Sequence, residues 1–204
     1  MKIKESLTKN METISDPVSA YPVATVDKLP TDLQEKILKI QEKTGFVPNV
    51  FLALGHRPKE LRAFFSYYEA VVSENLTLQK TEIEMIVVAT SSENKCPYCV
   101  VAHGAILRIY AKNPTLSDQL AINYNNASIS EEHRLMLSFA CKLARSPELI
   151  TAIDKKILTN NGFSDEQIWD IGAVTSFFAL SNRMAHLMNL RPNREFYDLA
   201  RDLN

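Results

Sequence analysis

The sequence predicts an all-α protein, because apolar residues recur at the three- and four-residue spacing of amphipathic helices along almost the whole chain. Glycine is scarce, with 5 residues among 204, and no segment shows the strict polar and apolar alternation of a half-buried strand. A chain of this length can bury a substantial hydrophobic core. We expect an N-terminal arm over residues 1–20 and a single helical domain over residues 21–204.

The first helices are predicted from their start and stop signals. A helix is expected from Thr31 to Gly45, and a short apolar segment follows over residues 46–56. Pro58 suits the first turn of a helix and begins the next one, which extends to about Val72.

The central helices are expected to begin behind polar caps. Thr77 would cap a helix that runs to about Ser92, and Asn94 would cap the next, which runs to about Ala111. A shorter helix is expected around residues 116–124. Together the two capped helices, over about residues 77–111, form the expected redox core described below.

The last third of the chain continues the helical pattern. One helix begins after Ser130 and is broken at Pro147, and the next ends before Gly162. A capping box at residues 164–167 opens a long helix to about Leu190, and a short helix ends the chain.

Two segments hint at an internal repeat. Residues 78–106 and 164–189 each read as a capped helix that ends in polar residues and continues to a histidine, His103 or His186. The fold would then have two degenerate, similar halves. The second half has no cysteines in the corresponding positions, so we expect it to serve as scaffold.

Composition excludes several classes of function. The formal net charge of -1 argues against nucleic-acid binding by bulk electrostatics. Residues 1–17 lack the apolar stretch of a signal peptide, and uncharged stretches such as 171–182 are too short to span a bilayer. We therefore expect a cytoplasmic protein with neither nucleic acid nor membrane as a partner. In that compartment a Cys-x-x-Cys pair is typically catalytic or metal-binding.

The candidate chemistry lies in residues 96–103, which read CPYCVVAH. On a helix, Cys96, Cys99 and His103 project from one face, because their spacing is i, i+3, i+7. The start of the helix favours a thiolate, and His103, one turn beyond Cys99, can accept its proton. This arrangement suits a dithiol that cycles to a disulfide beside a general base.

Glu84 is the candidate to orient His103. It is the only charged residue in the apolar run 83–89, so its carboxylate is expected to be buried and therefore to need a partner. A neighbouring imidazole would serve. The alternative is that Glu84 is a surface residue on an amphipathic helix.

Zinc binding is a second interpretation, with the two cysteines, His103 and Glu84 as ligands. A helical chain with a sizeable core does not need a structural zinc, so we expect neither a metal nor a cofactor. A c-type haem is excluded because Val100 stands where the attachment motif requires histidine. Cys141, in an apolar helical segment, is expected to behave as a small buried hydrophobe.

These residues resemble a known family. Glu84, followed by eleven residues and then Cys96-x-x-Cys99-x-x-x-His103, is similar to the active-site pattern of the AhpD-like alkylhydroperoxidases, which belong to the carboxymuconolactone decarboxylase family. The resemblance extends over roughly residues 20–200 and is closest to the peroxidase-related branch. Further matching segments are GFVPNVF at 45–51, HRP at 56–58, F-x-x-YY at 64–68 and S-x-EN-x-C-x-YC at 91–99.

The resemblance implies an all-helical fold and a homo-oligomer, whether dimer, trimer or hexamer. It also implies thiol peroxidase or disulfide reductase chemistry, in which Cys99 attacks the peroxide, activated by His103 and Glu84, and Cys96 is a more exposed resolving thiol. AhpD proteins proper carry a histidine directly before the second cysteine, where this chain has Tyr98. The decarboxylase members generally lack the cysteine pair, which argues against that activity.

The sequence thus predicts a thiol-dependent antioxidant enzyme that reduces a small hydroperoxide through a dithiol/disulfide cycle, with a dithiol or redox protein as reductant. One alternative is a disulfide reductase or redox adaptor with little peroxidase activity, and another is a zinc-binding assembly module. The apolar and aromatic content of residues 46–72 also favours contacts between subunits.

Overall fold

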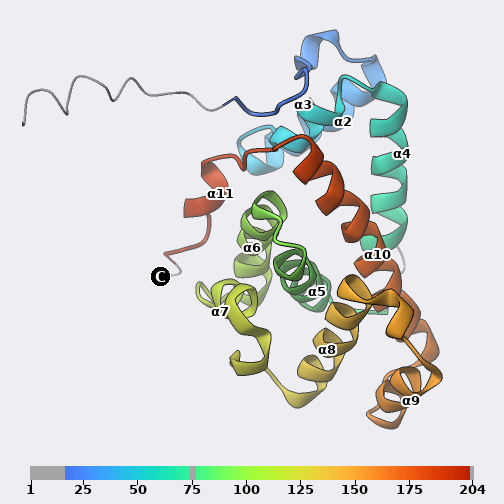
Figure 1. Cartoon of the computed structure of the whole chain (residues 1–204). Coiled ribbons are helices and arrows are strands. Elements are labelled where there is room, and N and C mark those ends of the chain that lie inside the picture. Colours follow the sequence, from blue (N-terminus) through green and yellow to red (C-terminus); the bar gives the residue numbers. More distant parts are fainter. Residues whose placement is uncertain (1–16, 74–76, 203–204) are drawn as a thin grey trace, which may run out of the picture.

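The computed structural model describes residues 17–73 and 77–202, and within these ranges every regular element is a helix (Figure 1). The all-α prediction is confirmed. The α-helices are α2 (Thr31–Thr44), α3 (Asn49–Leu54), α4 (Pro58–Tyr68), α5 (Lys80–Glu93), α6 (Pro97–Ala111), α7 (Leu116–Asn123), α8 (Glu131–Arg145), α9 (Ala152–Asn160), α10 (Asp165–Leu187) and α11 (Glu195–Asp198). Shorter 3₁₀ or π turns are η1 (Val26–Lys28), η2 (Glu69–Ser73), η3 (Tyr124–Asn126) and η4 (Pro147–Leu149).

Helix α5 lies at the centre of the fold. It packs against α6, α7, α8 and α10, and every residue from Ile83 to Ser91 is buried. A helix enclosed on all sides needs an apolar sequence all round, and the run of aliphatic residues in α5 provides it. Glu84 is carried into the interior as part of this run.

The hydrophobic core has two parts. One joins α5, α8 and α10 around Phe177 and Phe178, and the other joins α2, α3, α4 and α6 with the end of α10 and with α11. Cys96 and Cys99 belong to the second part. The apolar side chains of residues 46–72 also pack mainly within the core, so their composition gives no support for a subunit contact. Tyr67, which is 48% exposed, is an exception.

The helix boundaries agree with most of the expected signals. Helix α2 ends at Gly45, whose φ of 84° lies in the left-handed region, and Pro58 begins α4. The capping box at residues 164–167 opens α10 as predicted. Thr77, however, does not cap α5, because its amide and hydroxyl donate to Asp170 Oδ2 over 2.9 and 2.8 Å.

The segments that hinted at a repeat differ in form. Residues 78–106 are divided by a turn between α5 and α6, whereas α10 runs unbroken through most of residues 164–189. Of the expected N-terminal arm, residues 1–16 lie outside the described residues. Residues 17–20 form no helix or strand, and the Ala20 amide donates to the carbonyl oxygen of Met188 over 2.7 Å.

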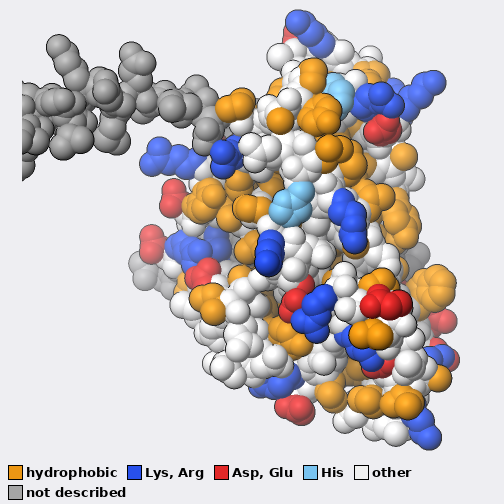
Figure 2. Space-filling view, in the orientation of Figure 1, with side chains coloured by type: hydrophobic (Ala, Val, Ile, Leu, Met, Phe, Trp, Pro, Cys, Tyr) orange, Lys and Arg blue, Asp and Glu red, His pale blue; other side chains and the backbone are white. Residues whose placement is uncertain are grey.

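Charged and hydrophobic side chains are interspersed over the face of the molecule shown in Figure 2. Within the described residues, no helix combines the length and the hydrophobicity needed to cross a membrane.

His133 links α8 to α5 and gives the fold a pH-dependent contact. Its Nε2 lies 3.3 Å from Glu82 Oε1. This hydrogen bond raises the pKa of His133 from 6.5 and lowers the pKa of Glu82, and burial opposes both shifts.

We predict that the stabilising effect of this contact falls as pH rises. A histidine whose pKa is higher in the folded state adds stability that is fully present below its unfolded pKa and disappears as pH rises through the folded one. The expected contribution is of the order of 0.5 kcal/mol. Urea unfolding should show a stability difference between the wild type and His133→Gln near pH 6 that shrinks toward about pH 8.5. A difference that is constant or grows over this range would contradict the assignment.

Candidate dithiol site

The turn between α5 and α6 places both cysteines at the start of α6. Asn94 ends α5, Lys95 has a φ of 52°, and Cys96 itself is the N-cap of α6. The expectation that Asn94 caps this helix is therefore wrong by two residues. The Cys96 amide donates to the carbonyl oxygen of Ser91 over 2.9 Å. Cys96 and Cys99 lie in the first turn, where the helix dipole stabilises a negative charge.

The two thiols are free and buried. Cys96 is 1% exposed and Cys99 is 2% exposed, so the fold buries both thiols almost equally, and the more exposed, resolving role that the resemblance implied for Cys96 stays a prediction. The Cys99 thiol hydrogen-bonds Cys96 and lowers the pKa of Cys96 to about 6, against the opposing effect of burial. The Cys99 amide, His186 and His103 lower it further. The same hydrogen bond, together with burial, raises the pKa of Cys99. These two shifts favour Cys96 over Cys99 as the thiolate of the reduced pair.

Glu84 and His103 form a buried pair. Glu84 Oε2 lies 2.8 Å from His103 Nδ1, and their side chains are 4% and 14% exposed. The interpretation of Glu84 as a surface residue is thus wrong. Because the carboxylate accepts from Nδ1–H, a neutral His103 keeps Nε2 free as a proton acceptor. The ring is further held edge-on against Phe178, with centroids 4.7 Å apart.

Glu84 also borders a cavity of about 170 Å³ between η2, α5 and α6. The cavity is lined by Tyr68, Val72, Lys80, Ile83, Glu84, Ile106 and Tyr110. Burial and the charge of Glu84 raise the pKa of Tyr68, so its hydroxyl remains a donor at neutral pH. Such a volume has room for several water molecules. Glu84 therefore borders a space that water can enter.

Helix α10 contributes polar groups that the sequence analysis assigned to scaffold. Ser181 Oγ lies 3.9 Å from Cys99 Sγ, and Asn182 Nδ2 donates to Ser91 Oγ over 3.0 Å. Hydrogen bonds from Asn182 and Ser181 favour the Cys99 thiolate and so moderate the upward shift of its pKa. The available signal was a group of polar residues, ending in His186, on an otherwise apolar helix.

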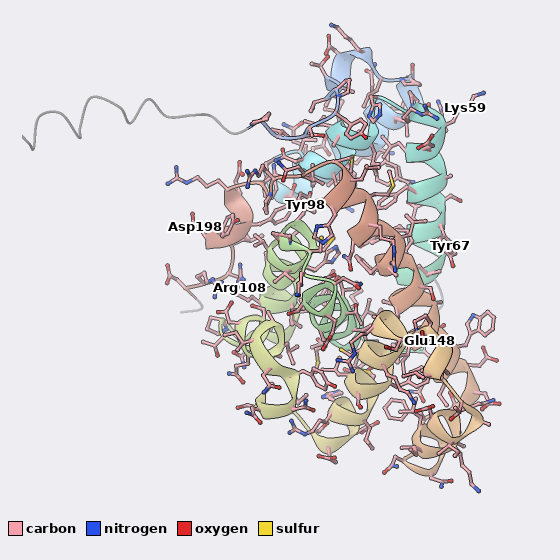
Figure 3. The ribbon with its side chains drawn as sticks, in the orientation of Figure 1. Lys59, Tyr67, Tyr98, Arg108, Glu148 and Asp198 are labelled. Atoms are coloured by element: carbon pink, nitrogen blue, oxygen red, sulfur yellow. The ribbon has the colours of Figure 1, made fainter. Side chains whose placement is uncertain are left out.

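Tyr98 has a structural role. It is 4% exposed, and its hydroxyl accepts from the Val50 amide over 3.2 Å, which ties the start of α3 to α6 (Figure 3). The same residue occupies the position of the second histidine in AhpD proteins proper, and its hydroxyl oxygen accepts a hydrogen bond from the backbone.

The zinc interpretation finds no support in the described part of the chain. There, no group of three or more His, Cys, Asp or Glu side chains is arranged to hold a metal ion. Cys141 is 1% exposed, and burial raises its pKa to about 12. Its expected behaviour as a small buried hydrophobe is confirmed.

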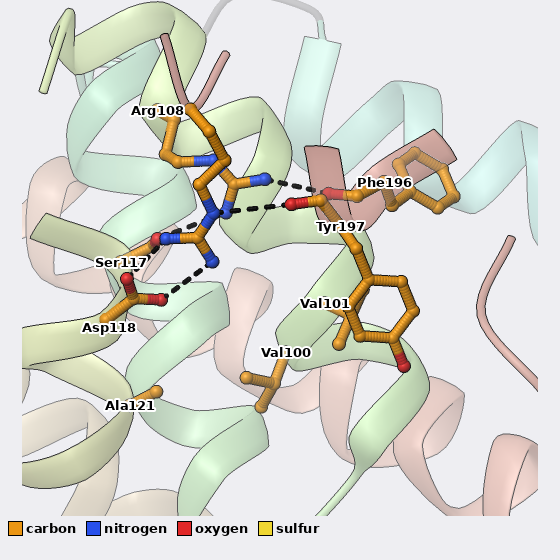
Figure 4. A pocket seen from close by; sticks show the side chains of 9 residues that line it. Val100, Val101, Arg108, Ser117, Asp118, Ala121, Phe196 and Tyr197 are labelled. Atoms are coloured by element: carbon orange, nitrogen blue, oxygen red, sulfur yellow. Dashed lines mark hydrogen bonds and ion pairs between the residues drawn. The ribbon is translucent and has the colours of Figure 1, made fainter. Parts of the chain in front are cut away.

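A second cavity, of about 60 Å³, lies on another side of α6, where Arg108 anchors α11 (Figure 4). Arg108 is 2% exposed and donates to the carbonyl oxygens of Phe196 and Leu199 over 2.7 and 2.9 Å. Beside it, exposed Arg201 forms an ion pair with Asp118. The Arg108 guanidinium therefore binds the backbone carbonyl groups of the C-terminal segment.

Replacing Arg108 with alanine should lower the free energy of unfolding by about 3 kcal/mol, because two carbonyl oxygens lose a charged donor. The matched control, Arg201→Ala, removes an exposed ion pair and should cost about 0.5 kcal/mol. Urea unfolding measures both values. Equal losses for the two variants would show that Arg108 does not anchor α11.

Comparison with known proteins gives consistent results. The model of the carboxymuconolactone decarboxylase family matches residues 58–114. No curated protein matches the chain.

Two solved structures are similar over nearly their whole length. An uncharacterized peroxidase-related protein from Ralstonia eutropha JMP134, described as an alkylhydroperoxidase AhpD core, is 52% identical with a TM-score of 0.90, and the match covers 92% of this chain and 99% of that one. An uncharacterized peroxidase-related protein from Silicibacter sp. TM1040 is 38% identical with a TM-score of 0.87, over 93% and 100% of the two chains.

A more distant structure shares the fold. The debrominase Bmp8, in complex with 2,3,4-tribromopyrrole, is 19% identical with a TM-score of 0.74, over 94% of this chain and 99% of that one.

Proposed function

The chain belongs to the AhpD-like group of the carboxymuconolactone decarboxylase family, and on that basis we propose that it is a thiol-dependent enzyme that reduces small hydroperoxides. The observation that carries the proposal is a Cys96–Cys99 dithiol at the N-terminus of α6, the helix that also carries His103 of the buried Glu84–His103 pair. One sulfur of the dithiol is ionised near neutral pH, and a general base stands one turn away.

The proposed reaction begins at Cys96. Its thiolate attacks the terminal oxygen of the hydroperoxide, the O–O bond breaks, and the alkoxide takes a proton from solvent to leave as the alcohol. Cys96 becomes a sulfenic acid. This order differs from the one that the resemblance implied, and it is supported by the charge distribution in the reduced pair.

The second step uses the Glu84–His103 pair. Cys99 gives its proton to His103 Nε2 and attacks the sulfur of the Cys96 sulfenic acid. Hydroxide leaves, takes the proton back from His103 and departs as water, so that a Cys96–Cys99 disulfide forms. A dithiol reductant then attacks this disulfide, is itself oxidised and restores both thiols.

Disulfide reduction with little peroxidase activity is the second candidate. It is favoured by the pKa of about 6 at Cys96, because an attacking thiol works best in exchange when its pKa lies near the ambient pH. Tyr98, whose hydroxyl is bound to Val50, also leaves the site without the second histidine of AhpD proteins proper.

The first test is consumption of an organic hydroperoxide by the purified protein with a dithiol reductant, beside a Cys99→Ser control. Steady-state turnover that disappears in the variant would support the peroxidase. A wild-type protein that reduces a small disulfide but no hydroperoxide would support the second candidate and overturn the first.

We further propose a cytoplasmic location and a homo-oligomer, as the family resemblance implies. Light scattering of the purified protein should give the mass of a dimer, trimer or hexamer rather than that of one 23.1 kDa chain. A monomer at all working concentrations would contradict the proposed assembly.

A further inference from the structure

His186 is joined to the turn that carries the attacking thiol. Its Nε2 lies 2.9 Å from the carbonyl oxygen of Asn94, so Nε2 bears the hydrogen and donates. Asn94 lies two residues before Cys96. Its side chain also binds α10, because Asn94 Nδ2 donates to Asn182 Oδ1 over 2.9 Å. The turn is thus fixed to α10 by both its backbone and its side chain.

The rest of this network reaches the N-cap directly. Asn182 is 1% exposed and uses its Nδ2 to bind Ser91 Oγ, while the carbonyl oxygen of Ser91 accepts from the Cys96 amide. Hydrogen bonds of Ser91 and Asn94 therefore connect the segment around Cys96 to the same turn of α10. Asn94 and Ser91 lie 88 to 92 residues before their hydrogen-bond partners on this helix.

The ionisable groups around the Cys96 sulfur come from two helices. Cys99, Tyr98 and His103 interact with it from α6, and His186 interacts with it from α10. The carboxylate of Glu84 is bound to His103. Lys95, on the turn itself, is exposed. His186 is thus the residue of α10 that both holds the turn and interacts with the Cys96 sulfur.

We propose that His186 is a positioning residue of the dithiol site, which fixes the turn before Cys96 by donating a hydrogen bond to the Asn94 carbonyl and so keeps the Cys96 thiol at the N-terminus of α6. The function of α10 then extends beyond scaffolding, because it supplies a histidine to a site whose cysteines lie on α6. The inference builds on the proposed dithiol function, but its test requires no turnover.

The test measures the rate at which iodoacetamide alkylates Cys96 in the reduced full-length chain as a function of pH, with Cys96, Cys99 and Cys141 resolved by peptide mass spectrometry. His186→Leu removes the hydrogen-bond donor to the Asn94 carbonyl. His186→Gln keeps a donor. His186 is exposed, so both variants are expected to fold, which their melting temperatures would verify.

In His186→Leu, alkylation of Cys96 near pH 7 should slow by about threefold to tenfold and its pH midpoint should move upward, because a loosened turn weakens the stabilisation of the thiolate by the helix N-terminus. His186→Gln should stay within about twofold of the wild type, and the control His133→Gln, on α8, should not change. A wild-type profile in His186→Leu would overturn the proposal. Equal slowing in the glutamine variant would overturn it too, because the hydrogen-bond donor would then have no effect.

The outcome is separable from that of the proposed function. A protein that consumes no hydroperoxide can still show the shift at Cys96, which would leave the role of His186 intact. Conversely, turnover of hydroperoxide with an unchanged alkylation profile in His186→Leu would support the enzyme and refute the positioning residue.

Discussion

Replacing Cys96 with serine is expected to abolish the reaction with hydroperoxide even in a single turnover, whereas Cys99→Ser should react once and stop. A serine hydroxyl is not ionised at neutral pH, so Cys96→Ser removes the attacking anion. In Cys99→Ser the new hydroxyl can still hydrogen-bond the Cys96 sulfur, but no second thiol is present to form the disulfide. We expect loss of at least about a hundredfold in the single-turnover rate for Cys96→Ser.

The measurement is rapid mixing of each reduced variant with one equivalent of an organic hydroperoxide, followed by trapping with dimedone. Cys99→Ser should give a dimedone adduct at Cys96, and both variants should fail in steady-state turnover. Cys141→Ser is the matched control, and it should behave as the wild type because its buried thiol has a pKa of about 12. An adduct at Cys99 in Cys96→Ser, with none in Cys99→Ser, would restore the order that the family resemblance implies.

The second large effect is expected for Glu84→Gln. The amide can donate to His103 Nδ1, which would move the ring proton to Nε2 and remove the acceptor that takes the proton from Cys99. Loss of general base catalysis typically slows a step by about 10²-fold to 10⁴-fold, and we expect the lower value for disulfide formation. The initial attack by Cys96 should change much less, because this thiol is ionised without a base.

Stopped-flow measurement of sulfenic acid decay in Glu84→Gln would test this directly. Glu82→Gln is the matched control, since Glu82 lies one residue outside the apolar run and pairs with His133 rather than with His103. His103→Gln should also slow disulfide formation and move its pH optimum upward, because Cys99 must then ionise without help. Disulfide formation within about twofold of the wild-type rate in Glu84→Gln would remove the pair from the mechanism.

The part of the site that could be predicted from the sequence is the part that local spacing determines. Cys96, Cys99 and His103 share one helical face, and Glu84 was recognisable as a lone charge in an apolar run. Each of these inferences needs only the period of a helix and the cost of a buried charge. The same reasoning correctly predicted an all-helical fold and most helix ends.

The errors involve partners that are distant in the sequence. Thr77 has the residue type of an N-cap, but Asp170 on α10 takes its hydrogen bonds. His186 and Asn182 could not be assigned to the site because their partners lie about 90 residues earlier. The burial of both thiols depends on how the second core part packs over the turn, and residue type does not determine that.

Because the two cysteines belong to the core part that joins α2, α3, α4 and α11, oxidation and folding are linked equilibria. The disulfide and dithiol forms, folded and unfolded, make a closed thermodynamic cycle. If the two forms differ in their free energy of unfolding, the disulfide of the folded chain must therefore differ by the same free energy, expressed as a reduction potential, from that of the unfolded chain. For this two-electron couple, a change of about 1.4 kcal/mol corresponds to about 30 mV. Substitutions of core residues such as Leu61 or Ile37, which touch no reactant, would therefore change the reduction potential of the Cys96–Cys99 pair whenever they affect the stability of the disulfide and dithiol forms unequally.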